Sequence, residues 1–158
     1  SGVKKYVLGS NTVSVLDGST IPVLAVPENA DFKSLKNVAY ASDMKKLERE
    51  VKTMLPFLTI FDTSLHVFHV AEKGSDKEAI QSKIKDILKK VNYRKSTVTV
   101  ESGKKIEGAI DSFVQKLNAD MLLMFTHEQS FFGKLFGKSM TKKMAFHSSV
   151  PLLAFKSK

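Results

Sequence analysis

Short apolar runs alternate with segments of helical periodicity from Leu35 onward. This alternation is typical of repeated strand–helix units that build a parallel sheet. The five apolar runs that we interpret as strands are, in chain order, Leu35–Ala41, Ser64–Val70, Ser96–Val100, Asp120–Phe125 and Pro151–Phe155. The pattern therefore predicts an α/β fold with a doubly wound, five-stranded parallel sheet.

The composition of two runs indicates where they lie in that sheet. Residues Ser96–Val100 alternate polar and apolar side chains, as an edge strand with one exposed face does. Residues Asp120–Phe125 are almost continuously apolar, which is typical of a central strand that is buried on both faces.

Helical spacing predicts the elements between the strands. The first helix should carry the apolar stripe Leu47, Val51, Met54 and Leu55. We expect Ser42 and Asp43 to cap it and Pro56 to kink or end it.

Two further helices follow the second and third strands. Ser75 and Glu78 have the spacing of a capping box. The apolar stripe of that second helix is Ile80, Ile84, Ile87, Leu88 and Val91, and the stripe of the third is Ile106, Ile110, Phe113 and Leu117.

A fourth apolar stripe lies between the last two strands. It consists of Phe132, Phe136, Met140 and Met144. Core packing against the sheet and a partner-binding surface are both open interpretations.

The first 27 residues break the strand–helix rhythm and repeat a later segment. Residues Gly9–Val26 parallel residues Gly137–Phe155, because each segment runs from a glycine and a serine through a helix to a proline-led apolar strand. A partial repeat suggests that the chain is a piece of a tandem protein.

The composition is that of a globular domain, with 158 residues of which 42% are hydrophobic and 26% charged. No apolar run approaches the roughly 20 residues of a membrane-spanning helix, and the start lacks a secretory signal. We therefore expect a cytoplasmic protein with no membrane partner. The absence of cysteine excludes disulfides, thiolate metal sites and a cysteine nucleophile.

The net charge of +9 is unevenly distributed, since Gln129–Lys158 hold six lysines and no acid. Such a segment could attract phosphates, nucleic acid or an anionic membrane, or form a solvated face. No arginine or base-stacking aromatic pattern accompanies the lysines, so nucleic acid is not the expected partner.

Two motifs carry a family resemblance. The repeated segments resemble the carboxyl-terminal signature of the universal stress protein family, and Asn118–His127 (NADMLLMFTH) are similar to its "ADLIVMGTHG" stretch. The resemblance implies a flavodoxin-like (Rossmann-like) sheet in the order 3-2-1-4-5. It further implies that residues 1–27 are the last helix and strand of a first domain, 28–34 a linker, and 35–158 a complete domain.

The resemblance also implies a pairing mode. Family members pair their last strands in an antiparallel manner, either as a homodimer or as a pseudo-dimer of two domains. Residues Ile21–Val26 are therefore expected to pair with Pro151–Phe155 as an added antiparallel strand that covers an edge of the sheet.

The family's ATP site has the pattern G-x-x-G-x9-G-[ST], in which glycines let backbone amides approach the phosphates. Here Phe125, Glu128 and Lys138 stand at the three glycine positions, and only Ser139 is kept. A carboxylate about 4 Å from a phosphate would cost on the order of 4 kcal/mol at an effective dielectric near 20. Lys138 could offset part of this, and Gly137 could take the missing position in a shorter loop.

Other nucleotide contacts are carried over from the resemblance. The complete set of candidate binding residues is Ala41, Asp43, Val70, Thr126, His127, Gly137, Lys138, Ser139 and Met140. Asp43 serves equally well as a helix cap, and Val70 as core. Gly9 and Ser10 keep part of the motif in the first-domain segment, which lacks the rest of a pocket.

The sequence signals for other kinds of functional site are weaker. Gly133–Ser139 has three residues between its glycines, whereas a phosphate-binding loop of the Walker type needs four. The four histidines show no ligand spacing, so we expect no metal. Ser42 and Ser102 have no evident histidine partner, and no nucleophile elbow is present, so no catalytic residue is expected.

These observations favour a non-enzymatic stress-response module that acts through domain pairing and has a degenerate ATP site. No cofactor is expected in that case. A nucleotide-binding sensor that takes ATP is the alternative, and an anion-binding lysine surface is a third.

Overall fold

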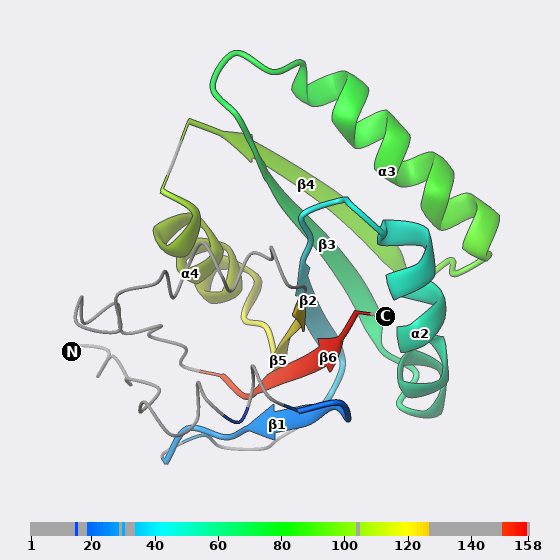
Figure 1. Ribbon diagram of the computed structural model, residues 1–158, viewed down its shortest axis with the longest axis vertical. Coiled ribbons are helices and arrows are strands. Elements are labelled where there is room, and N and C mark those ends of the chain that lie inside the picture. The colour runs from blue at the N-terminus through cyan, green and yellow to red at the C-terminus, as the bar shows by residue number, and fades with distance from the viewer. Residues whose placement is uncertain are drawn as a thin grey trace.

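The computed structural model describes residues 15, 19–28, 30, 34–103, 105–126 and 150–157. Their helices cover both faces of one sheet (Figure 1). The strands are β1 (Val23–Ala25), β2 (Asn37–Ala41), β3 (Ser64–Ala71), β4 (Ser96–Ser102), β5 (Met121–Thr126) and β6 (Leu152–Lys156). The helices are α2 (Leu47–Ile60), α3 (Lys77–Val91) and α4 (Ile106–Leu117).

The strand order confirms the predicted topology. The sheet runs β1-β6-β5-β2-β3-β4, in which β2 to β6 are parallel and β1 is antiparallel to β6. Read from β4 to β6, this is the flavodoxin-like order 3-2-1-4-5 with one added strand. As predicted, β4 lies at an edge and β5 is a central strand whose apolar side chains are buried.

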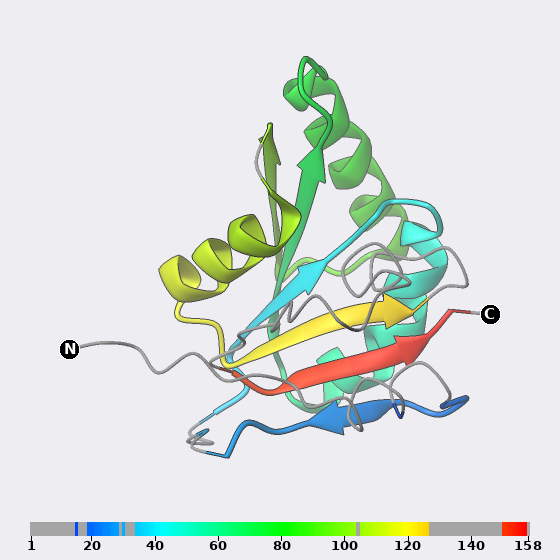
Figure 2. The same ribbon diagram turned by 60° about the vertical axis from the view of Figure 1, so that its left-hand side comes forward.

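Two apolar clusters hold the layers together, one on each face of the sheet. Helices α2 and α3 pack on one face around Val38, Val67 and Leu123, which are all fully buried. Helix α4 packs on the other face around Phe68 and Met124 (Figure 2). Alternate residues of each central strand supply the two clusters, because successive side chains of a strand point to opposite faces.

The added strand β1 pairs with β6 over its whole length. The register partners are Val23 with Ala154, Leu24 with Leu153, and Ala25 with Leu152. This confirms that the segment within Ile21–Val26 adds an antiparallel strand to the last strand of the sheet. Strand β6 thereby becomes an internal strand, with Leu152 1% exposed.

The start of α2 differs from the prediction that Ser42 and Asp43 cap it. The N-cap is Lys46, which makes no side-chain capping bond. The Ser42 Oγ accepts a hydrogen bond from the Met44 amide at 3.0 Å, and the Asp43 Oδ1 accepts one from the Lys45 amide at 3.0 Å. Both side chains stabilise the turn between β2 and α2, because Ser and Asp bond readily to backbone amides two residues ahead.

Of the two outcomes predicted for Pro56, a kink in α2 or its end, the second is wrong, since the helix continues through Pro56 to Ile60. An interior proline removes one hydrogen bond and costs about 3 kcal/mol. Leu58, in the last turn of the helix, is fully buried against the sheet face, and its burial offsets about 1.5–3 kcal/mol of that cost.

Helix α3 confirms the predicted periodicity and corrects its cap. The N-cap is Asp76, whose Oδ1 accepts a hydrogen bond from the Ala79 amide at 2.9 Å, so the capping residue is not Ser75. The aspartate satisfies an amide that the first helical turn leaves unpaired. At the other end, Asn92 adopts a left-handed conformation with φ 58° and ends the helix.

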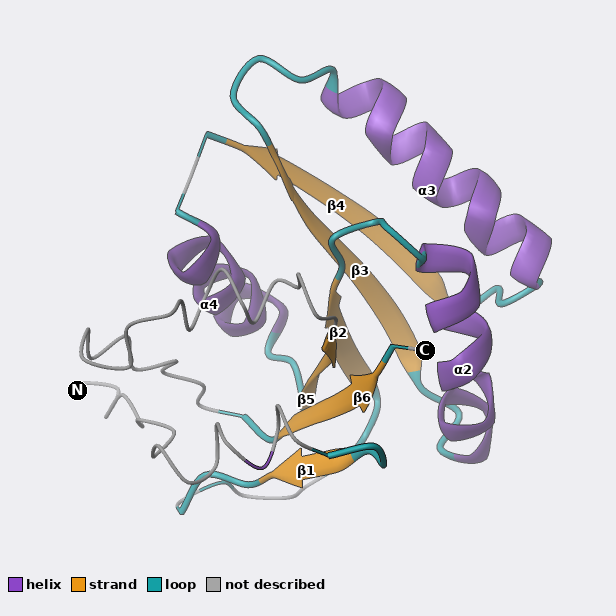
Figure 3. Ribbon diagram, viewed as in Figure 1, coloured by secondary structure: helices purple, strands orange, loops and turns teal. Residues whose placement is uncertain are grey.

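Figure 3 shows α2, α3 and α4 packed against the strands. Over the described ranges, no helix has the length and apolarity needed to cross a bilayer. The stripe Phe132, Phe136, Met140 and Met144 lies outside the described residues, as do Gly9 and Ser10.

Candidate functional site

The carboxyl ends of β2 and β5 diverge at the point where the winding of the sheet reverses. From β2 the sheet extends to β3 and β4, and from β5 to β6. The β2–β5 pairing stops at Tyr40 and Leu123, whereas β5 continues to Thr126 opposite Lys156 of β6. Open α/β sheets bind ligands in the crevice at such a switch point.

The turn after β2 is held against the end of β3. The Ser42 amide donates to the Phe68 carbonyl at 2.9 Å, and the His69 Nδ1 donates to the Ser42 carbonyl at 2.8 Å. These two bonds bring Asp43 and Val70 to the same edge of the sheet. His69 contacts the carbonyl of Ser42 and not its hydroxyl, so this pair does not have the geometry of a nucleophile and its base.

The candidate residues at this edge differ in what they offer a ligand. Ala41 is 4% exposed, and Val70 packs against the cluster under α4, so both side chains belong mainly to the core. Asp43 is half-buried, with Oδ1 bonded to the Lys45 amide. A nucleotide at this edge would therefore contact Asp43 and the backbone of the two strand ends.

The remaining candidates concern the phosphate loop. Thr126 is the last residue of β5. The other predicted contacts lie outside the described residues, and they are His127, Gly137, Lys138, Ser139 and Met140.

Phe125 stands where the family's first glycine would be, and its side chain lies in the core. It is 5% exposed, stacks on Phe155 with ring centroids 5.0 Å apart, and meets Tyr40 edge-on at 6.0 Å. The ring is thus directed into the core under α2. The ring anchors β5 to β6 on the side of the sheet away from α4.

A buried polar pair next to these rings was missed by the sequence analysis. The Tyr40 hydroxyl donates a hydrogen bond to the Glu50 Oε2, and Tyr40 and Glu50 are 1% and 2% exposed. Burial, and secondly the Glu50 charge, raises the pKa of Tyr40 well above 10.0, so the phenol stays protonated as a donor. The spacing of Glu50 from Leu47 and Met54 places it on the buried stripe of α2, and this was the available signal.

Glu50 also lines a cavity of about 340 Å³ between α2 and the end of β6. Charged side chains from both elements border it, with Arg49 and Glu50 from α2 and Lys156 from β6. Thr20 and Pro22, which precede β1, form part of its wall. The segment that adds β1 to the sheet therefore also contributes to this cavity.

The described histidines do not form a metal site. His66 lies on the α4 face, where its Nε2 donates to the Asn37 Oδ1 at 3.1 Å and its Nδ1 accepts from the Thr97 hydroxyl at 2.7 Å. Burial lowers the pKa of His66, which fits this neutral tautomer. Within the part of the chain that the structure describes, no three acidic or histidine side chains gather to hold a metal ion.

Solved structures share the fold at low sequence identity. A universal stress protein from Archaeoglobus fulgidus DSM 4304 is 21% identical with a TM-score of 0.68, and the match covers 91% of this chain and 52% of that one. This chain thus spans about half the length of that relative. No curated protein sequence matches the chain.

Two further structures were solved with nucleotides. A universal stress protein in complex with cAMP is 16% identical with a TM-score of 0.60, covering 80% of this chain and 100% of that one. One from Archaeoglobus fulgidus in complex with dAMP is 15% identical with a TM-score of 0.52, covering 75% and 96%.

The sequence model of the universal stress protein family matches residues 49–156, from the first turn of α2 to the end of β6. That range is more than half of the chain and contains four of the five parallel strands. The sheet order and the family match agree with each other, and the chain belongs to the universal stress protein family.

Proposed function

We propose that the chain is a non-enzymatic stress-response module that works by pairing the final strands of two universal stress protein domains. The observation that carries the proposal is the antiparallel register of Leu24 with Leu153. Strand β1 follows a segment that repeats the one before β6, so it takes the part of a second domain's last strand. The nucleotide site is degenerate in this proposal, because the glycines of its phosphate loop are replaced.

Exposed apolar residues in and beside β1 support a pairing role. Ile21, Leu24 and Val26 are 70%, 50% and 59% exposed, although each is a large apolar residue. Apolar side chains grouped at a sheet edge favour contact with another protein surface. In the proposal this surface contacts the body of a second universal stress protein domain, on the same chain or on another copy.

A disulfide trap tests the pairing directly, because the chain contains no cysteine of its own. Directly opposed residues of an antiparallel pair have Cα atoms about 4.5–5.5 Å apart, which suits a disulfide. Leu24→Cys combined with Leu153→Cys should therefore crosslink on mild oxidation. The matched control is Leu24→Cys with Ala154→Cys, whose side chains point to opposite faces of the sheet.

Non-reducing electrophoresis with peptide mapping distinguishes the outcomes. A crosslink within one chain supports a pseudo-dimer, and a crosslink between two chains supports a homodimer. Equal crosslinking of the test and control pairs, or none in either, would overturn pairing through the last strands.

A nucleotide sensor is the second candidate, and the crevice at the switch point favours it. The ends of β2 and β3 are held together there, with Asp43 at the edge. The structural neighbours solved with cAMP and dAMP bind nucleotides on the same fold. In this role ATP would lie between Asp43 and the residues that follow Thr126, with Lys138 on the phosphates.

Thermal unfolding with and without millimolar ATP and magnesium separates the two candidates. A ligand at 100 times its dissociation constant adds about 2.7 kcal/mol of stability. The pairing module shows no shift. A rise in melting temperature that Lys138→Glu abolishes and Lys116→Glu preserves would replace it with the sensor.

A further inference from the structure

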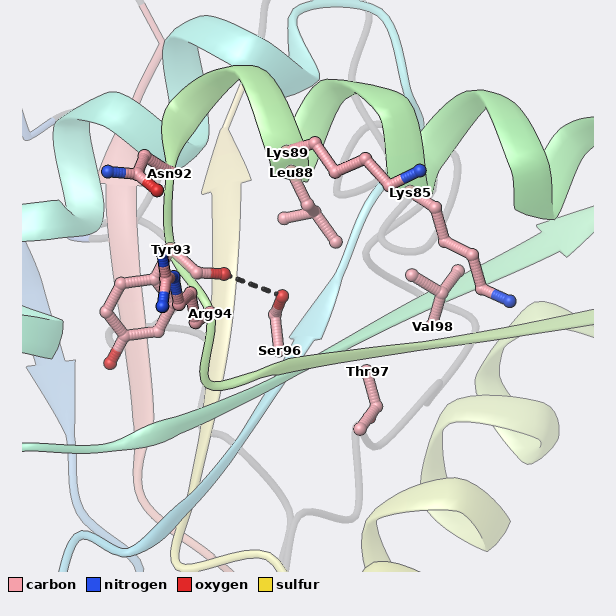
Figure 4. Close-up of a pocket in the computed structure, with 9 residues that line it drawn as sticks. All are labelled: Lys85, Leu88, Lys89, Asn92, Tyr93, Arg94, Ser96, Thr97 and Val98. Atoms are coloured by element: carbon pink, nitrogen blue, oxygen red, sulfur yellow. Dashed lines mark hydrogen bonds between the residues drawn. The ribbon is translucent and has the colours of Figure 1, made fainter.

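A groove lies at the β4 edge of the sheet, far along the sheet from β1. It has a volume of about 410 Å³ and runs between the second half of α3 and the first half of β4. In Figure 4, Leu88 of α3 and Val98 of β4 point toward each other across the groove, and the Lys85 side chain extends from α3 toward β4. The size is within the range of ligand sites, about 300–1,000 Å³.

The groove is basic at its rim and apolar at its floor. Lys85, Lys89 and Arg94 line it together with Leu88 and the ring of Tyr93.

One acidic side chain approaches a cation of the groove and leaves this charge largely intact. Asp86 approaches the Lys89 Nζ at 3.7 Å, and the two side chains are 63% and 80% exposed. An exposed pair at that distance contributes little energy and does not cancel three cations.

The backbone of β4 turns hydrogen-bonding groups outward along the same groove. The Lys95 carbonyl accepts a hydrogen bond from the Leu65 amide of β3 at 2.8 Å, so the backbone carbonyl of Lys95 points toward β3. Successive residues of a strand turn their backbone groups to alternate sides, and Ser96, Val98 and Val100 therefore face outward. The strand order ends at β4 among the described residues, so no further strand of those residues covers this side.

Gln81 shows that this outer side accepts hydrogen-bond donors. Its Nε2 donates to the Val98 carbonyl at 3.0 Å, which is the bond that the backbone amide of an added strand would make. An added strand lies about 4.8 Å from its neighbour, and its alternate side chains on the α3 face would enter the groove.

We propose that the β4 edge binds an extended acidic segment of a partner protein as an added strand. Its backbone pairs with the outward groups of Ser96, Val98 and Val100. Its acidic side chains reach Lys85, Lys89 and Arg94, and its apolar ones cover Leu88. Main-chain bonds then supply affinity, and the charge of the groove selects the partner. This site is independent of the β1–β6 pairing.

The first test uses a six-residue, fluorescein-labelled peptide with blocked ends in which glutamate alternates with valine. Fluorescence anisotropy should show binding to the chain at least about tenfold tighter than that of the lysine–valine peptide. Lys89→Glu should weaken binding by about tenfold or more. Lys90→Glu is the matched control, because it makes the same charge change in the same helical turn outside the groove, and it should change affinity by less than about twofold. Equal loss in both variants would overturn the groove as the site.

The second test separates strand addition from simple charge attraction. Two versions of the acidic peptide carry N-methyl groups on alternate sets of amides, so that one version has its β4-facing donors blocked. One set should abolish binding and the other preserve it, and Gln81→Ala should tighten binding about threefold by freeing the Val98 carbonyl. Equal binding of both methylated peptides would overturn strand addition.

The same measurements distinguish other occupants of the edge. Light scattering of the chain alone gives its mass in solution. A two-chain mass that falls to one chain on adding the acidic peptide would assign the edge to a second copy and overturn the proposal. Competition by inorganic phosphate as strong as that by the peptide would assign the groove to small anions and overturn it as well.

Discussion

The two edges of the sheet differ in the polarity of the side chains that they expose. At one edge, β1 covers β6, and exposed apolar side chains lie in and beside β1 at Ile21, Leu24 and Val26. At the other, β4 is polar, Gln81 bonds one of its outward carbonyls, and a basic groove lies beside it. Unpaired sheet edges favour association with other strands. The side chains at each edge therefore determine which partners can pair with it.

The difference between the β1 edge and the β4 edge indicates how one sheet can offer surfaces for two kinds of contact. Apolar side chains favour a large and lasting interface, since burial of their area supplies the free energy. Cations around a small groove favour a charged segment that exchanges rapidly and responds to salt.

The largest effect is expected in the strand that β1 covers. Leu152 is 1% exposed between Ala25 of β1 and Leu122 of β5. Leu152→Ala should lower the free energy of unfolding by about 2–5 kcal/mol, because it leaves a cavity. Urea denaturation measures the loss, and Val98→Ala in half-buried β4 should cost less than half as much. Similar losses would mean that the two strands are equally buried.

The same substitution at two tyrosines compares buried with half-buried hydrogen bonds. Tyr40→Phe removes the donor to the Glu50 carboxylate in the core and should cost about 1.5–3 kcal/mol. Tyr93→Phe, beside the β4 groove, removes a donor to the Thr63 carbonyl and should cost about 0.5–1.5 kcal/mol. Urea denaturation of both variants provides the test, and a reversed order of the two costs would contradict it.

A smaller effect is expected at the helix that flanks the β4 groove. Asp76→Ala removes the bond to the Ala79 amide at the start of α3 and should cost about 1 kcal/mol. Ser75→Ala should stay within about 0.5 kcal/mol, because Ser75 is not the capping residue. Thermal unfolding of the two variants decides between these positions, and a larger loss at Ser75 would restore the capping box.

The smallest effect is a pH dependence at His66, which bonds to Thr97 of the β4 edge. Burial lowers the folded-state pKa of His66 from 6.5, so the unfolded chain binds more protons than the folded chain between those two values. The stability contribution of the neutral imidazole is complete above about pH 6.5 and declines as the pH falls toward the folded-state pKa. His66→Gln should flatten this part of the curve of unfolding free energy against pH, and an unchanged curve would exclude His66 as its source.

Periodicity predicted the strands and helices well because burial decides both the pattern and the fold. The stripe from Ile80 to Val91 needs a sheet face to cover it, and α3 packs on one. The antiparallel strand was predictable from the repeat and the family resemblance, since local propensity alone would not place three residues of β1 beside β6.

Local sequence signals for helix boundaries gave wrong predictions where a second signal opposed them. Ser75 and Asp76 are both good caps, and the spacing to Glu78 favoured the wrong one. Pro56 is a strong helix breaker by itself, but the buried Leu58 keeps α2 intact beyond it.

The candidate sites were harder to predict than the fold because they depend on contacts between distant residues. Glu50 is buried as a polar residue with the help of Tyr40, which lies on another element and gives it a donor. The β4 groove exists only where α3 crosses the strand, and no spacing along the chain marks that crossing.

The direction of β1 has a mechanical consequence. Val23, where the chain enters β1, lies opposite Ala154, close to where the chain leaves β6 at Lys156. A tension applied through the segments before β1 and after β6 therefore pulls on the same end of the pair. It opens the hydrogen bonds one after another, as a zipper opens, and does not load them all in shear. Strand β1 should therefore detach from β6 at a smaller force along the chain than the force that separates the parallel strands from one another.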